Sequence, residues 1–391
     1  MQTTPNIYTL RFGQLCLSSL FFSASYNMLI PELPGYLSGL GGSEYIGLII
    51  ALFTLTAGFS RPFSGVLTDT IGRKPVMVIG AMVCVVCGIL YPVLGSVAGF
   101  LFLRLFHGFS TGFTPTAIAA YVSDSIPAQR WGEAFGVQSL FFSTGLAVGP
   151  ALGSWIKLHF SFNILFLSSS LMALLALILI ARLQETLVNK ERFRWRLLKI
   201  SGKDIIAQEV FVPAVITFLS YTAFGMVLTL IPDWSEFLGI KNKGSFFIVF
   251  TITSLMIRFL AGKASDRLGR KPISMIGLLV LLVGLLLMAT LKSPEGLLFA
   301  AGIYGFSMGM LSPAVSAWTF DLSPEDKKGT GVATMFIALE AGIGLGALFS
   351  GWYYQSTYEN IPGAMLGCSF LAFLGLLFLT ISKNKSINSD H

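Results

Sequence analysis

Gly65-Val-Leu-Thr-Asp69-Thr-Ile-Gly72-Arg73-Lys74-Pro75 is a short charged turn between two long apolar runs, and the chain repeats it. The second copy is Gly262-Lys-Ala-Ser-Asp266-Arg-Leu-Gly269-Arg270-Lys271-Pro272. Between residues 61–75 and 258–272, seven of fifteen positions are identical at a constant offset of 197 residues. That offset is close to half of the 391 residues, so it indicates duplication of a whole domain.

The composition indicates that most of the chain lies in lipid. Hydrophobic residues make up 54% of the sequence and charged residues 12%, and the mean hydropathy is +0.76. A bilayer core about 30 Å thick needs roughly 20 apolar residues per helix. Such runs lie near residues 9–30, 45–66, 75–95, 98–121, 133–154, 162–181, 209–231, 245–264, 273–291, 296–319, 330–353 and 362–381. The sequence therefore predicts an all-α polytopic membrane protein with twelve transmembrane helices, rather than a barrel of short alternating segments.

The basic residues predict how the chain crosses the membrane. If the first span runs outward, the inner segments hold 19 of the 26 Lys and Arg residues. Cytoplasmic loops carry such an excess, so we expect a multi-pass protein of the plasma membrane, a bacterial inner membrane, with both termini in the cytoplasm. The net charge of +7 needs no nucleic-acid partner, because these bases lie where anionic lipid headgroups would be.

Six spans in each half place both copies of the turn on one face, so the halves are related by a parallel repeat. We expect an N-terminal half at residues 1–181, a cytoplasmic linker at residues 182–208 and a C-terminal half at residues 209–391. Residues 192–199 of the linker mix bases with apolar side chains, as a helix lying on the inner leaflet would.

Three motifs resemble the major facilitator superfamily, and the resemblance covers the whole chain. The repeated turn is similar to that family's signature between spans two and three and its repeat between spans eight and nine. Arg104-x-x-His107-Gly108 resembles its fourth-span motif, although His107 stands where Gln is more usual. The motif in span five resembles that of the family's twelve-span drug/proton antiporters, and consists of Gly145, Gly149, Pro150 and Gly153. We expect these glycines to allow close packing across the interface between the halves.

The resemblance implies that the two turns latch the halves together on the cytoplasmic side. Asp69 would face the start of span eleven, while Arg73 would reach Asp124. In the second copy, Asp266 would face span five, and Arg270 would reach Asp321. The latch then comprises Gly65, Asp69, Gly72, Arg73, Lys74, Asp124, Asp266, Gly269, Arg270 and Asp321. The alternative is a pair of solvated basic loops that only fix the topology.

Matched positions of the repeat that hold different residue types in the two halves indicate a function that only one half has. Arg104 is matched by Ala301, and Glu340 by Ser143. Charges within a span are costly and mark cavities or proton paths, so we interpret Glu340 as a proton-coupling residue, and the family resemblance implies that Arg104 faces the cavity and takes part in coupling or substrate binding. The alternative for Glu340 is a protonated packing residue or an ion-pair partner of Arg258. We expect Arg61 and Arg258, near cytoplasmic span ends, to snorkel to the interface.

In the family that the chain resembles, spans one, four, seven and ten line a central substrate cavity. That resemblance selects Tyr26, Asn27, Arg104, His107, Tyr221, Thr222, Tyr304, Ser307 and Met308. A lone histidine such as His107 is also compatible with a hydrogen-bonded packing role. Because the set is more aromatic and amphipathic than charged, it favours a lipophilic or modestly polar substrate.

The sequence contains no Walker loop, zinc motif or nucleophile elbow, so we expect neither an ATP-driven pump nor an enzyme. We expect a monomeric secondary transporter in membrane lipid that exports lipophilic or amphipathic small molecules in exchange for protons. Its two halves would rock about a central site, driven by the proton gradient and without a cofactor. The alternatives are an exporter of one metabolite, such as a sugar, metallophore or lipid-like molecule, and a non-transporting receptor or scaffold.

Overall fold

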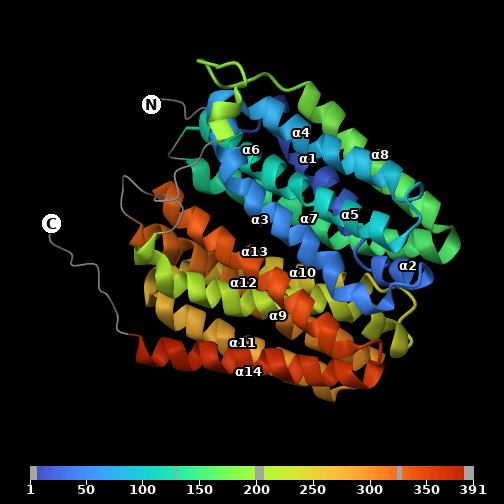
Figure 1. Ribbon diagram of the computed structural model, residues 1–391. Coiled ribbons are helices and arrows are strands. Elements are labelled where there is room, and N and C mark those ends of the chain that lie inside the picture. Colours follow the sequence, from blue (N-terminus) through green and yellow to red (C-terminus); the bar gives the residue numbers. More distant parts are fainter. Residues whose placement is uncertain (1–6, 128–129, 199–206, 324–327, 383–391) are drawn as a thin grey trace.

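The structure is a computed structural model that describes residues 7–127, 130–198, 207–323 and 328–382, in which all regular elements are helices (Figure 1). The first half contains α1 (Leu10–Asn27), α2 (Leu33–Gly39), α3 (Ile46–Thr70), α4 (Arg73–Leu90), α5 (Val97–His107), α6 (Phe109–Ser125), α7 (Trp131–His159) and α8 (Phe162–Ala181). The second half contains α9 (Phe211–Phe237), α10 (Ser245–Leu268), α11 (Arg270–Thr290), α12 (Pro294–Leu322), α13 (Lys328–Tyr354) and α14 (Ile361–Ile381).

Each of the twelve predicted apolar runs overlaps one or two of these helices, and only the short helix α2 lies outside the runs, which confirms the all-α membrane fold. Among the described residues, nine helices are long and apolar enough to cross a membrane, or ten if the bent helix α10 counts as one span. The first run contains α1, which ends at Asn27, and the fourth run overlaps both α5 and α6, which meet at Gly108. In Figure 1 the helices from α1 to α8 form one bundle and those from α9 to α14 form another.

The glycines of α7 pack against α1 of the same half. An added Cβ on Gly149 would lie 2.9 Å from the carbonyl oxygen of Ala24, and one on Gly153 would overlap that of Met28. In the second half Gly342 of α13 meets α9 in the same way, 2.5 Å from the carbonyl oxygen of Phe218. The prediction that the span-five glycines pack across the two halves is therefore wrong, because they face a helix of their own half.

The repeated turn has the same backbone conformation in both halves. Gly72 and Gly269 have φ angles of +121° and +94°, which a residue with a Cβ rarely adopts. Glu185, in the linker that follows α8, accepts hydrogen bonds from the backbone N–H groups of Arg73 and Lys74 at 3.0 and 3.1 Å. The carboxylate thus caps the N-terminus of α4, where free N–H groups and the helix dipole favour an anion.

The linker shows less helix than the sequence suggests. Within the predicted helix at residues 192–199, only Trp195–Leu198 form a helical turn, of the 3₁₀ type, and Trp195 is 80% exposed. The expected helix ends at residue 199, which lies outside the described residues together with the rest of the linker up to residue 206.

The two halves touch at the end of the molecule that lies away from the repeated turns. There Gly351 of α13 lies against Gly47 of α3, so that an added Cβ on Gly351 would lie 2.5 Å from the Gly47 nitrogen. A second contact between the halves joins the loop before α10 to α7, where the side chain of Asn242 donates a hydrogen bond of 3.1 Å to the carbonyl oxygen of Ala151. We call this the sealed end, and the end with the Arg73 and Arg270 turns the basic end.

Candidate substrate cavity

A cavity of about 710 Å³ lies between the two halves. Its lining begins at Ile30, just beyond the end of α1, and at Ile50 of α3, and continues toward the basic end to Gly65 of α3 and Val332 of α13. Helices of both halves contribute to it, namely α1, α3, α5, α6, α7, α9, α10 and α13. Because the halves are in contact at the sealed end, the cavity faces the basic end.

Four of the nine predicted cavity residues line this space: Tyr26, Asn27, Arg104 and Tyr221. The structure corrects the other five, which lie in the packing between helices: His107, Thr222, Tyr304, Ser307 and Met308. The ring of His107 lies between the hydroxyl of Tyr91 and the thiol of Cys84, at 3.2 and 3.3 Å. Ser307 donates a hydrogen bond of 2.8 Å to the carbonyl oxygen of Gly277 on α11. These positions lie on helix faces turned away from the cavity.

An ion pair in the cavity wall connects the two halves. Glu340 of α13, which is 8% exposed, accepts hydrogen bonds from Nη2 of Arg61 at 2.7 Å and from its Nε at 3.3 Å. Arg61 belongs to α3, and its guanidinium also lies 4.4 Å from the ring centre of Phe336. Arg61 therefore does not snorkel to the interface as we expected, and it takes the place that the sequence suggested for Arg258.

Arg104 is held in the wall by neutral groups. The side chain is 1% exposed, and its Nε donates a hydrogen bond of 2.8 Å to the carbonyl oxygen of Ile49. Nη1 lies 3.4 Å from the hydroxyl of Tyr91, and the guanidinium lies 4.6 Å from the ring centre of Phe53. The Ile49 carbonyl dipole, the Tyr91 hydroxyl and the Phe53 ring stabilise the cation, and no acidic partner lies beside it among the described residues.

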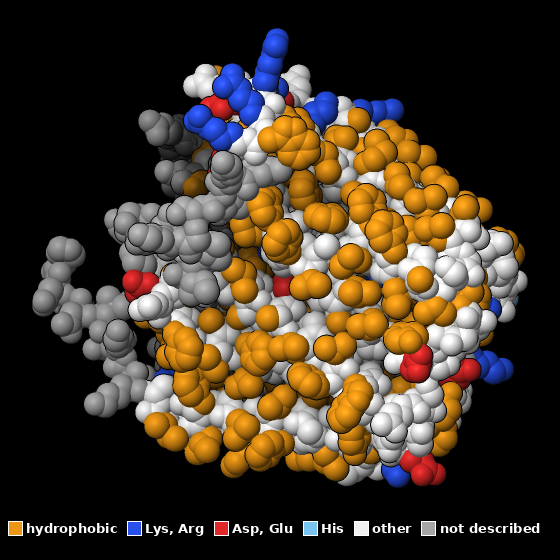
Figure 2. All heavy atoms as spheres, viewed as in Figure 1, with side chains coloured by type: hydrophobic (Ala, Val, Ile, Leu, Met, Phe, Trp, Pro, Cys, Tyr) orange, Lys and Arg blue, Asp and Glu red, His pale blue; other side chains and the backbone are white. Residues whose placement is uncertain are grey.

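An apolar groove of about 1060 Å³ runs along the outside of the contact between α3 and α13. Hydrophobic side chains cover this face in Figure 2, and charged side chains gather toward its ends except for one acidic spot in the middle. Thr54, Pro62, Ile337 and Glu340 line both the groove and the central cavity. The two spaces therefore meet at the Arg61–Glu340 ion pair.

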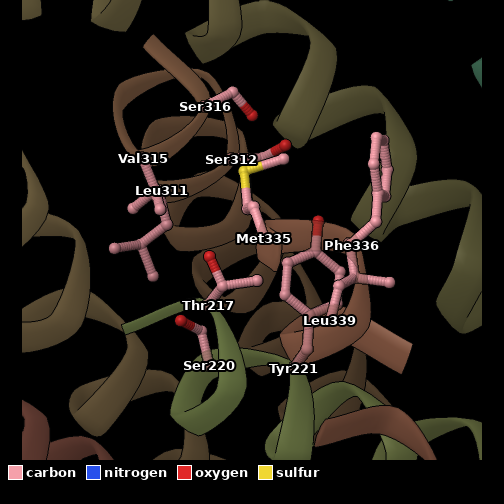
Figure 3. Close-up of a pocket in the computed structure, with 10 residues that line it drawn as sticks. All are labelled: Thr217, Ser220, Tyr221, Leu311, Ser312, Val315, Ser316, Met335, Phe336 and Leu339. Carbon is pink, nitrogen blue, oxygen red and sulfur yellow. The ribbon is translucent and has the colours of Figure 1, made fainter. Parts of the chain in front are cut away.

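A side pocket of about 150 Å³ lies within the second half (Figure 3). Thr217, Ser220 and Tyr221 of α9 face residues of α12 across it, and Met335 of α13 lies between them. Tyr221 and Phe336 line both this pocket and the central cavity. The pocket thus adds hydroxyl groups beside an otherwise apolar and aromatic wall.

The latch residues are arranged at the basic end. Arg73 pairs with Asp124 at 2.9 Å, and Arg270 pairs with Asp321 at 2.8 Å, as the resemblance suggested. The side chain of Asp69 is 72% exposed and pairs with Arg73 at 3.1 Å. That of Asp266 is 66% exposed and pairs with Arg270. Neither aspartate is bonded to the opposite half among the described residues, since the cavity separates the halves at this end.

Glu32, a buried carboxyl that follows α1, lies at the sealed end. It is 7% exposed, and its Oε1 accepts a hydrogen bond of 2.7 Å from the hydroxyl of Ser154 on α7. Burial raises the pKa of Glu32 above its ordinary value, although the bond from Ser154 and the charge of Lys243 oppose the shift. No pattern in the sequence signals this pair, because the two residues come together only through the packing of α7 on α1.

Known proteins resemble the chain over most of its length. A multi-drug resistance efflux pump PmrA homolog of Lactococcus lactis subsp. lactis is 27% identical to it, with 93% of each chain covered. The multidrug resistance protein MdtG of Salmonella typhi is 24% identical, covering 90% of this chain and 86% of its own. Among solved structures, a point mutant of the nucleoside transporter NupG superposes with a TM-score of 0.80 at 13% identity, covering 95% of this chain and 99% of its own.

A crystal structure of the human organic anion transporter MFSD10 superposes with a TM-score of 0.72 at 20% identity, covering 94% of this chain and 98% of its own. These two structural likenesses concern the fold alone. The model of the Major Facilitator Superfamily matches residues 15–245 and 213–390, which together span nearly the whole chain. With its two helical bundles, its central cavity and this match, the chain belongs to the major facilitator superfamily of membrane transporters.

Proposed function

We propose that this protein exports lipophilic or amphipathic small molecules in exchange for protons, as a monomer in a bacterial plasma membrane. The observation that carries this proposal is the Arg61–Glu340 ion pair, which connects α3 and α13 inside the cavity. A proton on Glu340 removes one charge of that pair. Proton binding thereby weakens a bond between the two halves, which is what coupling to a rocking motion requires.

The direction of transport follows from the orientation that the basic residues favour. With the basic end in the cytoplasm, the cavity of the structure is open to the cytoplasm and closed at the outside. Substrate binds in this inward-facing state while Glu340 is paired with Arg61. After the halves rock, the substrate leaves, and a proton from outside binds Glu340 and accompanies the return.

The substrate class is supported by the lining and by the relatives. The cavity wall contains the rings of Tyr26, Phe53, Phe142, Phe224 and Phe336, and the adjoining groove would give a compound dissolved in the bilayer access to Glu340. The relatives from Lactococcus lactis and Salmonella typhi are named as multidrug efflux or resistance proteins. We extend that activity to this chain as part of the proposal.

The two turns serve, in this proposal, as the latch of the outward-facing state. When the halves close at the basic end, Asp69 and Asp266 exchange their exposed positions for contacts with the opposite half. Arg73–Asp124 and Arg270–Asp321 hold each turn against its own half throughout. Asp69→Asn should therefore leave the amount of folded protein unchanged and slow transport.

Purified protein in proteoliposomes tests the proton role of Glu340. We expect Glu340→Gln to bind a lipophilic dye but to lose transport driven by a pH gradient, because the amide cannot exchange a proton. Glu295→Gln, which changes an exposed acid at the start of α12, should transport at the normal rate. Transport by Glu340→Gln at the normal rate under a pH gradient would exclude Glu340 as the proton carrier.

A further inference from the structure

We propose that the molecules exported through this cavity are amphipathic organic anions, with a carboxylate, sulfonate or phosphonate group on an apolar body. This inference rests on the proposed export function and names the substrate class of the same cavity. It comes from the charges of the wall. Among the described residues, the lining contains three arginines and a single acid, namely Arg61, Arg104, Arg258 and Glu340.

The only acid of the described lining, Glu340, already forms an ion pair with a basic residue of the protein. Glu340 is bonded to Arg61 at 2.7 Å, so these two charges compensate each other. Arg104 contacts a backbone carbonyl, the hydroxyl of Tyr91 and the ring of Phe53, none of which carries a charge. Arg258 has no ion pair among the described residues. Two guanidinium charges of the wall are thus left without an anion in the part of the chain that the structure describes.

Arg258 offers the more available of these two charges. Its Nε is buried and has no hydrogen-bond partner within the described part of the chain. The residue lies on α10 and lines the cavity together with Tyr221 of α9. A buried donor without a partner is costly, and a guanidinium presents a planar fork that matches carboxylate, sulfonate or phosphonate oxygens. An anionic group of the substrate would satisfy this donor.

The surroundings of these charges decide against a cationic substrate. Charges interact more strongly in a cavity with apolar walls than in water, because less solvent screens them. A cation would be repelled by Arg104 and Arg258, and Glu340 could attract it only by releasing Arg61. The aromatic rings of the wall, such as Phe53, Phe224 and Phe336, then accommodate the apolar body of the anion. Charge and apolar surface together select an amphiphile with a negative head.

Three dansyl compounds that share one fluorophore test the charge preference: dansyl glycine (anionic), dansyl amide (neutral) and dansyl cadaverine (cationic). Binding is measured on the purified full-length protein, and transport in proteoliposomes under a pH gradient. We expect dansyl glycine to bind at least tenfold more tightly than dansyl cadaverine. Arg258→Gln should weaken binding of the anion about tenfold and leave the neutral compound unchanged, while Arg258→Lys should retain an intermediate affinity.

Arg267→Gln is the matched control, because Arg267 is exposed on the same helix. It should bind all three compounds like the wild type. Tighter binding of the cation, equal binding of all three compounds, or an unchanged anion affinity in Arg258→Gln would overturn the inference. If the pH gradient drives only the neutral and cationic compounds, export stands and the anion preference fails. If the gradient drives none of them although they bind, the proposed export function fails.

Discussion

Arg61 and Glu340 show at the residue scale how a membrane protein keeps charges within its spans. A lone charge at the centre of a transmembrane helix costs about 2.5–3.5 kcal/mol on insertion scales. The bond of 2.7 Å between the two side chains offsets much of this cost, but the loss of hydration keeps the net gain small. Since Arg61 and Glu340 belong to different halves, the ion pair holds the two halves together in this conformation and adds little to the net stability of the fold.

We predict that the single variants Arg61→Gln and Glu340→Gln are each less stable than the double variant. Either single change leaves one buried charge without its partner, which costs on the order of 3 kcal/mol. The double variant has two neutral amides that can bond to each other. Thermal unfolding of the four proteins in one detergent measures the coupling. Additive effects of the two substitutions would show that the pair does not interact.

A second prediction concerns Glu32, whose pKa is raised by burial. The native state binds this proton more tightly than the unfolded state, so the stability that Glu32 contributes is present at acidic pH and is lost as the pH rises through the native pKa. A glutamine keeps the oxygen that accepts the bond from Ser154 but never ionises. Glu32→Gln should therefore match the wild type near pH 4 and unfold at a higher temperature at pH 8. A lower unfolding temperature at pH 8 would contradict this explanation.

The sequence identified single charges better than it identified their partners. Glu340 stands out because a buried acid within an apolar run needs a reason, and the structure does place it in the cavity wall. The role of Arg61 was missed, because its distance from the span end fits both snorkelling and an inward orientation. Tyr304 and Ser307 were predicted to line the cavity but face α11. Which of the two they face depends on the rotation of α12 about its axis, and the composition of the span does not determine that rotation.

At the element scale, glycines determine which helices lie close together. The face of α7 with Gly145, Gly149 and Gly153 lies directly on the backbone of α1, and small residues permit this approach in membranes. The apolar runs predicted the long helices correctly, whereas the neighbour of the glycine face of span five was predicted wrongly. Glu185 shows the same limit, since its bond to the α4 N-terminus joins residues more than a hundred positions apart.

The glycines of α7 provide an internal comparison. Gly153→Ala should destabilise the protein by about 1–3 kcal/mol, because the new Cβ overlaps the carbonyl oxygen of Met28 and backbone atoms cannot move aside separately. Gly136→Ala, on the same helix, has open space around the new Cβ. It should be neutral or stabilising by up to about 1 kcal/mol through helix propensity. Equal unfolding temperatures for the two variants would refute the packing argument.

The whole molecule combines a cavity at the basic end with backbone contacts at the sealed end. In Gly351→Ala the added Cβ would meet the backbone of Gly47, so the substitution should separate the halves at the sealed end. We expect Ile30→Cys, in the cavity lining, to react several-fold faster with an impermeant maleimide added from that side. The four native cysteines are buried and should not interfere. Gly39→Ala, with open space around its Cβ, is the control.

An unchanged labelling rate in Gly351→Ala, at equal folding, would mean that the Gly47–Gly351 contact does not hold the sealed end closed. Faster labelling in both variants would instead indicate a general loosening of the structure.

The charge of the substrate also sets how the whole transporter responds to membrane potential. In a one-for-one exchange, a proton moving in and a monovalent anion moving out transfer two charges, each worth about 2.3 kcal/mol per 100 mV. An inside-negative potential, imposed with potassium and valinomycin, should therefore accelerate export of dansyl glycine from proteoliposomes. Exchange of a proton for a cation would be electroneutral. An export rate of the anion that does not change with the membrane potential would contradict a one-for-one exchange.

The glycine contacts at the sealed end have a consequence for how such a transporter diversifies. The halves meet there through main-chain atoms of Gly47, Gly351 and Gly244, whose chemistry is the same whatever side chains surround the cavity. Substitutions in the cavity wall can then alter the range of exported compounds while the closure of the sealed end is preserved. Gating and substrate choice are thereby encoded by separate sets of positions, and natural variants can acquire new cargo one residue at a time.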